Sequence, residues 1–229
     1  MVSGSAARRV DAVIFDWGGT LPPWHDVDLP EQWRVFAREI HGHRLGDADV
    51  DPADLEHAQA LADTILAAES KAWARGRHEH TSADLAGVLE AAGVDPSHER
   101  HYLALAAYPR FWEPHTHTDP QVRPLWEGLK ARGIKVGILS NTIWSRDYHR
   151  EVFARDGVLD LIDGDVYSSE IDHVKPHPEA FREACRAVGV SPTAAVYVGD
   201  RMFEDVHGPQ QVGMRAIWIP HSDLPAAQR

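Results

Sequence analysis

The chain has 229 residues, 43% of them hydrophobic and 25% charged, which is enough to bury a core and to hold one average domain with a smaller insertion. Its formal net charge is -12 at pH 7, so it offers no basic excess for phosphate backbones or anionic lipids. We therefore expect a small-molecule partner, and neither nucleic acid nor a membrane surface.

The first predicted element is a strand over residues 10–15, an apolar run that ends at Asp16. The turn that follows contains the pair Gly18-Gly19, so a single carboxylate leaves the end of a buried strand and enters a flexible turn. A nucleophile would be well placed at this position.

Residues from about 29 to 112 show helical periodicity and no convincing strand. The predicted helices span residues 31–40, 52–74, 82–92 and 98–111. This part of the chain is therefore predicted to be all-helical.

After residue 120 the pattern changes to alternating helices and strands. The predicted helices span 124–132, 145–155, 178–188 and 203–212, and the predicted strands span 134–139, 166–168, 195–198 and 216–219. Strands separated by helices of this length predict an α/β fold, a Rossmann-like parallel sheet covered by helices on both faces. Because the strand over 10–15 belongs to the same sheet, the helical block is an insertion.

We predict a core domain made of residues 1–23 and 119–229, and an inserted all-helical cap domain of residues 24–118. The linkers near both boundaries are rich in proline and histidine and lack clear periodicity. Two linkers that leave the same side of a sheet form a natural hinge for a lid.

Chemically reactive side chains follow the predicted strands of the core. They are Asp16, Ser140, Asn141, Lys175 and Asp200, with Asp205 five residues after the last of these. In an open parallel sheet, ligands bind beyond the carboxyl ends of the strands. Each residue alone has an ordinary explanation as a turn, a helix cap or a solvated side chain, but together and in this order they form a specific pattern.

Four motifs carry a resemblance to a known family over essentially the whole chain: Phe15-Asp16-Trp17-Gly18-Gly19-Thr20, Leu139-Ser140-Asn141, Lys175-Pro176, and Gly199-Asp200 with Asp205. With these motifs the chain resembles the haloacid dehalogenase-like (HAD) hydrolase superfamily, in the subgroup with a small helical cap. The resemblance implies the same α/β core and cap that the predicted elements indicate.

The resemblance also implies a chemistry. Asp16 would attack phosphorus and form an aspartyl-phosphate, which divides one difficult hydrolysis into two easier displacements. Mg²⁺ is the implied cofactor, held by the Asp16 and Asp200 side chains and by the backbone carbonyl of Gly18. Asp205 would contribute to the metal site through a water molecule or by orienting the loop.

The implied substrate is a small phosphorylated molecule. Its phosphoryl charge would be met by the Ser140 hydroxyl, by the backbone amides around Asn141 and by the Lys175 ammonium, with Gly19 and Thr20 also in contact. Lys175 would in addition screen Asp16 from the substrate anion, so we count it as catalytic together with Asp16.

Gly18 departs from the family pattern. Most phosphatases of the family carry at this position an aspartate that protonates the leaving oxygen, and a positioned general acid or base contributes a factor of about 10² to 10⁴ in rate. Its absence handicaps alkyl phosphates most, because a good leaving group needs no proton. His25 in the hinge or a histidine of the cap is a candidate for a substitute acid.

Three interpretations follow from this departure. The first is a working phosphohydrolase that acts on an activated phosphate or uses another acid in place of the missing aspartate. The second is a phosphonate-cleaving or dehalogenating relative; the phosphonate hydrolases of the family need a cap lysine, and Lys71 is the only lysine of this cap. The third is a catalytically attenuated HAD-fold protein that binds a metal or a partner with little or no turnover.

The tryptophans are divided between the two predicted domains. Trp218 is expected in the core, whereas Trp24, Trp33, Trp73 and Trp112 would form an apolar wall over the substrate and favour an organic leaving group over a highly charged one.

Residues 1–9 contain arginines but no apolar stretch, so they predict neither a signal peptide nor a membrane span. The single cysteine, Cys185, excludes an internal disulfide bond. We expect a cytoplasmic protein that is a monomer or a homodimer.

Overall fold

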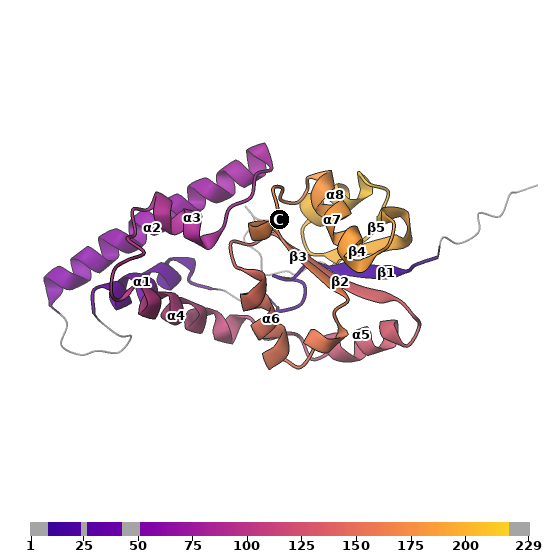
Figure 1. Ribbon diagram of the computed structural model, residues 1–229, viewed down its shortest axis with the longest axis horizontal. Coiled ribbons are helices and arrows are strands. Elements are labelled where there is room, and N and C mark those ends of the chain that lie inside the picture. Colours follow the sequence, from indigo (N-terminus) through magenta and orange to yellow (C-terminus); the bar gives the residue numbers. More distant parts are fainter. Residues whose placement is uncertain (1–8, 24–26, 43–50, 220–229) are drawn as a thin grey trace, which may run out of the picture.

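The computed structural model describes residues 9–23, 27–42 and 51–219 of the chain (Figure 1). Five parallel strands form one sheet in the order β3-β2-β1-β4-β5. Their bounds are β1 Ala12–Phe15, β2 Lys135–Ser140, β3 Gly164–Tyr167, β4 Ala195–Gly199 and β5 Arg215–Trp218. The predicted parallel α/β sheet is confirmed.

The central strand β1 pairs with β2 on one side and with β4 on the other, and Phe15 lies opposite Ile138 and Val198. The chain builds the sheet outward from β1 to β3 and then returns to the opposite side of β1 with β4. In such sheets the loops diverge where the direction of winding changes, and this leaves a crevice above the carboxyl ends of the strands. The register therefore delivers Asp16 and Asp200 to neighbouring positions in that crevice.

Helices cover both faces of the sheet because alternate strand side chains point to opposite sides. On one face, α5 (Val122–Lys130) and α6 (Arg146–Arg155) bury Trp126 and Phe153 against β1 and β2. On the other, α7 (Pro178–Val188) buries Phe181 and its neighbours.

The inserted block consists of helices, as predicted. They are α1 Leu29–Ile40, α2 Pro52–Glu79, α3 Leu85–Ala91 and α4 His101–Trp112. Helix α1 packs against both α2 and α4, and the four helices, called the cap below, lie to one side of the sheet (Figure 1). They have a hydrophobic cluster of their own, which includes Trp33, Phe36, Ile65 and Tyr108. The exact limits of a cap domain at residues 24–118 stay a prediction.

Short helical turns connect the remaining elements: η1 Glu113–His115, η2 Leu159–Leu161, η3 Ser168–Glu170, η4 Pro192–Ala194, the π-helical η5 Met202–His207, and α8 Gly208–Gln210. Within the described part of the chain, no helix combines the length and the apolar character needed to cross a membrane.

Two sequence predictions about the C-terminal part are wrong. The single helix predicted over 203–212 is instead η5 followed by α8, because Asp205 is held by partners outside its own turn, as described below. Trp218 is 47% exposed and not in the core, because β5 is an edge strand with one neighbour. Its indole Nε1 donates a hydrogen bond to the backbone oxygen of Asp200 at 2.9 Å.

The cap is joined to the core at several places. The backbone N–H of Leu85 donates to the Ile143 carbonyl at 2.9 Å, and that of Val174 donates to the His80 carbonyl at 3.2 Å. The two linkers also run side by side, since the Asp119 N–H donates to the Leu21 carbonyl at 2.9 Å. The cap therefore lies over the carboxyl edge of the sheet, where the predicted site residues gather.

Candidate active site

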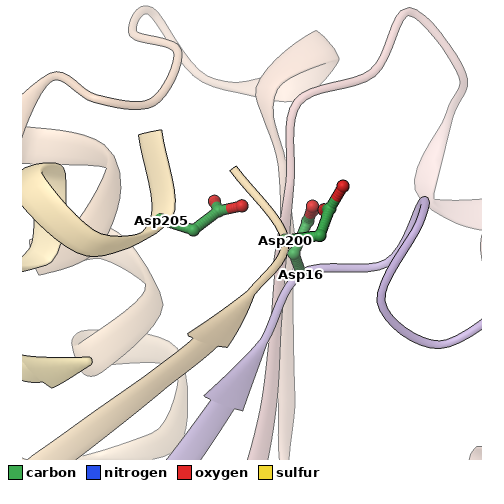
Figure 2. A group of neighbouring side chains, drawn as sticks. All are labelled: Asp16, Asp200 and Asp205. Carbon is green, nitrogen blue, oxygen red and sulfur yellow. The ribbon is translucent and has the colours of Figure 1, made fainter. Parts of the chain in front are cut away.

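Three aspartates converge at the carboxyl ends of β1 and β4. Asp16 follows β1, Asp200 follows β4, Asp205 belongs to η5, and all three side chains are buried. A carboxylate oxygen of each lies within 4.8 Å of the others. Figure 2 shows Asp16 and Asp200 side by side, with Asp205 reaching toward them from η5.

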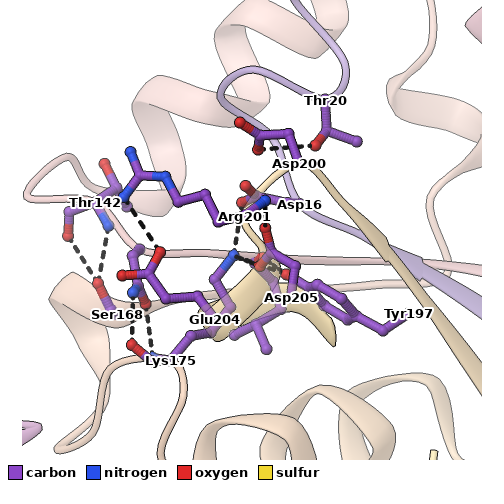
Figure 3. Close-up of polar contacts among 12 residues, drawn as sticks. Asp16, Thr20, Thr142, Ser168, Lys175, Tyr197, Asp200, Arg201, Glu204 and Asp205 are labelled. Carbon is purple, nitrogen blue, oxygen red and sulfur yellow. Dashed lines mark hydrogen bonds and ion pairs between the residues drawn. The ribbon is translucent and has the colours of Figure 1, made fainter. Parts of the chain in front are cut away.

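Lys175 neutralises two of these carboxylates at once (Figure 3). Its Nζ lies 2.9 Å from Asp16 Oδ1 and 2.8 Å from Asp205 Oδ1, and it donates to the Tyr197 hydroxyl at 2.8 Å. Burial lowers the pKa of the Lys175 ammonium, but the charges of Asp16 and Asp205 outweigh burial and hold the pKa above its ordinary value. Lys175 is therefore a permanent buried cation.

Asn141 positions Lys175 through its side chain. The Asn141 amide accepts from the Lys175 backbone N–H at 2.8 Å and donates to the Lys175 carbonyl at 2.9 Å. The Tyr197 hydroxyl in turn donates to the Leu139 carbonyl at 2.7 Å. These bonds tie the lysine loop to the end of β2, and Ser140, at that end, is buried.

Asp205 has a donor on each oxygen. Besides Lys175 on Oδ1, the Arg201 backbone N–H donates to Oδ2 at 2.9 Å. A Cβ at Gly199 would lie 2.4 Å from Asp205 Cγ, so only glycine leaves room for this side chain. The geometry suits an orienting function for Asp205 better than direct metal ligation.

The turn after β1 lies next to Asp200. Thr20 Oγ1 donates to Asp200 Oδ1 at 3.3 Å, and Gly19 has a φ of 83°, a backbone conformation that favours glycine. Gly18 and Gly19 line a cavity above the aspartates, whereas Thr20 does not.

The aspartate cluster fits a divalent cation. Among the described residues, Asp200 Oδ2 is a buried oxygen without a hydrogen-bond partner. Burial raises the pKa of Asp200, and the charges of Asp16 and Asp205 raise it further, because Lys175 does not compensate all of this negative charge. Hard carboxylate oxygens in such a cluster are the ligands that Mg²⁺ prefers.

A cavity of about 360 Å³ lies between the sheet edge and the cap. On the core side it is lined by Asp16, Ser140, Asn141 and Lys175. On the cap side it is lined by residues that include Glu69, Trp73, Tyr108 and Trp112. A reacting group at Asp16 is thus enclosed by aromatic side chains of the cap.

Sequence reasoning missed several charged residues of the cavity, among them Arg77, Arg201 and Glu69. Arg201, whose guanidinium donates to Glu204 at 3.2 Å, has no signal beyond its place directly after Asp200. Glu69 has a signal that was available: it follows Ala62 and Ile65 on the buried face of α2, where a carboxylate is unexpected.

Other predicted residues are distributed as follows. Trp73 and Trp112 line the cavity, whereas Trp33 is fully buried among the cap helices. His115 lines the cavity, and Lys71 is exposed and does not. His25 and Trp24 lie outside the described residues.

Comparisons with known proteins give the same picture. The family model for haloacid dehalogenase-like hydrolases matches residues 10–213. The glyceraldehyde 3-phosphate phosphatase of Methanopyrus kandleri is 32% identical, over 92% of this chain and 84% of the relative.

Two solved structures share the fold. A HAD phosphatase from Thermococcus onnurineus has a TM-score of 0.60 at 24% identity, covering 95% of this chain and 89% of that one. A 2-haloacid dehalogenase from Pseudomonas syringae pv. Tomato DC3000 has a TM-score of 0.59 at 25% identity, covering 96% and 91%. The chain belongs to the haloacid dehalogenase-like hydrolase family, and it is a hydrolase of the phosphatase-like type.

Proposed function

We propose that the protein is a phosphatase that hydrolyses a small organic phosphate through covalent phosphorylation of Asp16. The observation that carries the proposal is the contact between Asp16 and the buried Lys175 ammonium, 2.9 Å apart, at the base of the cavity. The similarity to the Methanopyrus kandleri phosphatase over 92% of this chain supports the reaction class.

The first displacement begins at the Asp16 oxygen that Lys175 does not hold. This oxygen forms a bond to phosphorus while the ester P–O bond breaks, and the leaving oxygen departs with the bonding electrons and takes up a proton. Lys175 and the Ser140 hydroxyl meet the charge of the phosphoryl oxygens. In the second displacement, water attacks phosphorus, the acyl phosphate P–O bond breaks, and the Asp16 carboxylate is restored.

The Asp16 and Asp200 carboxylates, with the Gly18 backbone carbonyl, would hold Mg²⁺. A divalent cation there supplies the positive charge that lets a carboxylate approach a phosphate anion. Asp205 orients the residues around this metal site, because it accepts hydrogen bonds from the Lys175 ammonium and from the Arg201 backbone N–H.

Gly18 sets the expected range of leaving groups. It supplies no carboxyl proton, so esters with good leaving groups should react faster than alkyl esters unless another acid serves. Among the described histidines, His115 of η1 lines the cavity and is therefore the candidate for such an acid.

The competing hydrolases have less support from this site. Phosphonate cleavage through a cap lysine would require Lys71, which is exposed and does not line the cavity. Halide displacement does not need the second and third aspartates, which here form one cluster with Asp16.

The test measures release of phosphate from p-nitrophenyl phosphate and acetyl phosphate, with Mg²⁺ and with EDTA. We expect Mg²⁺-dependent turnover that Asp16→Asn abolishes and that Asp63→Asn, an exposed aspartate of α2, leaves intact. Phosphate release from phosphonoacetaldehyde, or halide release from a 2-haloacid, with none from the phosphate substrates would contradict the proposal. Mg²⁺ binding without any turnover would favour a binding protein.

A further inference from the structure

Glu69 of α2 places a carboxylate on the cap side of the cavity. Its Oε2 accepts from the Trp33 indole at 2.7 Å and more weakly from the Gln32 amide at 3.4 Å, and its Oε1 accepts from the Trp73 indole at 3.5 Å. The Trp112 indole donates to the other end of Gln32 at 2.9 Å. Helices α1 and α2 thus direct donors toward one carboxylate, and Trp112 of α4 is connected to it only through Gln32.

The described lysine and arginine side chains that line the cavity are Arg77, Lys175 and Arg201, and none of them forms an ion pair with this carboxylate. Among the described residues, no lysine, arginine or histidine forms an ion pair with Glu69, and none influences its pKa. Burial raises the pKa of Glu69 above its ordinary value, and the hydrogen bonds from Trp33 and Trp73 oppose that rise only in part. Buried charges in proteins are ordinarily paired with an opposite charge. Glu69 lies beside the cavity without such a partner, and a cationic group of a ligand can supply one.

The walls around Glu69 are aromatic. Trp17, Trp73 and Trp112 line the same cavity, and Tyr108 lies close enough for the Glu69 charge to act on its hydroxyl. Aromatic rings next to a carboxylate attract organic cations through the negative potential of the ring faces.

The core side of the cavity, opposite Glu69, holds the residues that the proposed reaction uses to bind a phosphate. Asp16 with Lys175 lies on the core side, where the proposed reaction requires the phosphoryl group. A substrate that spans the cavity would therefore carry its phosphate at one end and meet the Glu69 carboxylate at the other.

We propose that Glu69 and the surrounding tryptophans bind an organic ammonium group, so that the substrate class is phosphate esters of amino alcohols or their methylated forms. This inference rests on the proposed phosphatase function for the reaction, but the ammonium site itself does not require turnover.

The kinetic test compares phosphocholine and phosphoethanolamine with 3,3-dimethylbutyl phosphate, the uncharged carbon isostere of phosphocholine. We expect the wild-type kcat/KM to favour the ammonium substrates by at least about tenfold, mainly through KM. Glu69→Gln should remove that preference. Glu56→Gln removes the same charge from an exposed position of α2 and should change nothing.

A binding test is independent of turnover. Choline and ethanolamine, which carry no phosphate, are titrated while tryptophan fluorescence is followed, in wild type, Glu69→Gln and Glu56→Gln. Saturable binding that only Glu69→Gln weakens, by about tenfold or more, supports the ammonium site even if no ester is hydrolysed. The relative preference for phosphocholine or phosphoethanolamine then distinguishes methylated from primary ammonium groups.

Any of three results overturns the inference. One is equal kcat/KM for phosphocholine and its carbon isostere in an enzyme that hydrolyses p-nitrophenyl phosphate, which leaves the phosphatase proposal intact. The second is the absence of Glu69-dependent binding of either amine, and the third is a preference for glycerol phosphate. Failure of every phosphate substrate, by contrast, refutes the phosphatase proposal, and the amine titration alone then decides the ammonium site.

Discussion

Lys175 is the residue on which the electrostatics of the site depend. Its ammonium lies within 2.9 Å of Asp16 and 2.8 Å of Asp205, in a position that is 2% exposed. Without it, Asp16 and Asp205 would lose the ammonium that both of them contact, and Arg201 would be the nearby cation left to act on the three aspartates. Removing one member of such a buried group leaves charges that are both desolvated and unpaired.

We expect Lys175→Met to abolish turnover and to lower the free energy of unfolding by about 3–5 kcal/mol in EDTA. The double variant Lys175→Met/Asp205→Asn should regain part of that stability without activity, because it removes one of the two unpaired carboxylates. Urea denaturation of both variants measures this. Equal stability of Lys175→Met and wild type would show that the lysine is not paired as described.

Gly18 is the residue that distinguishes this site from the usual family pattern. It lines the cavity together with Asp16. We expect Gly18→Asp to raise kcat for alkyl phosphates by up to about 10²-fold, with a smaller change for p-nitrophenyl phosphate, whose leaving group needs no proton. Gly18→Asn, which has the same shape but no acid, is the control. Equal gains for both variants, or for both classes of ester, would contradict this function of the position.

His149 connects helix α6 to the turn that carries Asp16. Its ring stacks on Tyr167 at 4.2 Å and meets Trp17 edge-on at 4.6 Å, and its Nδ1 lies 2.9 Å from the Ser145 carbonyl. The side chain is fully buried, and burial lowers the pKa of His149 from 6.5 to about 4. The folded protein therefore holds a neutral imidazole where the unfolded chain would protonate it.

This shift predicts an acid-sensitive fold. Between pH 6.5 and about 4 the imidazole of His149 binds a proton in the unfolded chain but not in the folded chain. The stabilising contribution of the neutral His149 is therefore fully present above pH 6.5 and is lost as the pH decreases through that window. The contribution of His149 amounts to at most about 3 kcal/mol. His149→Gln keeps a polar group without the titration, so its free energy of unfolding should fall less steeply over the same window. Parallel pH profiles for the two proteins would contradict the assignment.

The elements that sequence reasoning predicted well are those with strong local signals. The strands β1, β2 and β4 are apolar runs, and the cap helices have clear helical periodicity, so their patterns decide their structure. The turn η5 was missed because its shape depends on Asp205, whose partners include Lys175 from a distant loop. Glu69 was missed although its position after Ala62 and Ile65 on the buried face of α2 was a local signal; only its strongest donor, Trp33 on another helix, gave none.

An aromatic stack connects the cap to the core, in addition to the backbone hydrogen bonds between them. Tyr108 of α4 stacks on Trp33 of α1 at 4.5 Å and on Trp144 of the core at 4.3 Å, and Trp144 stacks on Tyr148 at 4.3 Å. Ile143 and Trp144, which follow β2, belong to the hydrophobic cluster of the cap. The cap and the sheet therefore share one apolar contact that also forms part of the cavity.

We expect wild type to unfold in one cooperative calorimetric transition because of this shared cluster. Trp144→Ala removes the central ring of the stack on the core side. Because Trp144 is only partly buried, the free energy of unfolding should fall by less than the about 3–5 kcal/mol of a fully buried tryptophan, and the melting of the cap should separate from that of the sheet. A single transition in the variant, merely shifted to a lower temperature, would show that the stack does not couple the two parts.

The central claim, that Asp16 becomes phosphorylated, has a direct test. The enzyme is mixed with acetyl phosphate and Mg²⁺, quenched in acid, digested and analysed by mass spectrometry, with Asp16→Asn as the control. The account predicts one phosphoryl group on the peptide that contains Asp16, and none on the same peptide of the variant. Turnover with unmodified Asp16, or phosphorylation at another residue that persists in Asp16→Asn, would contradict it.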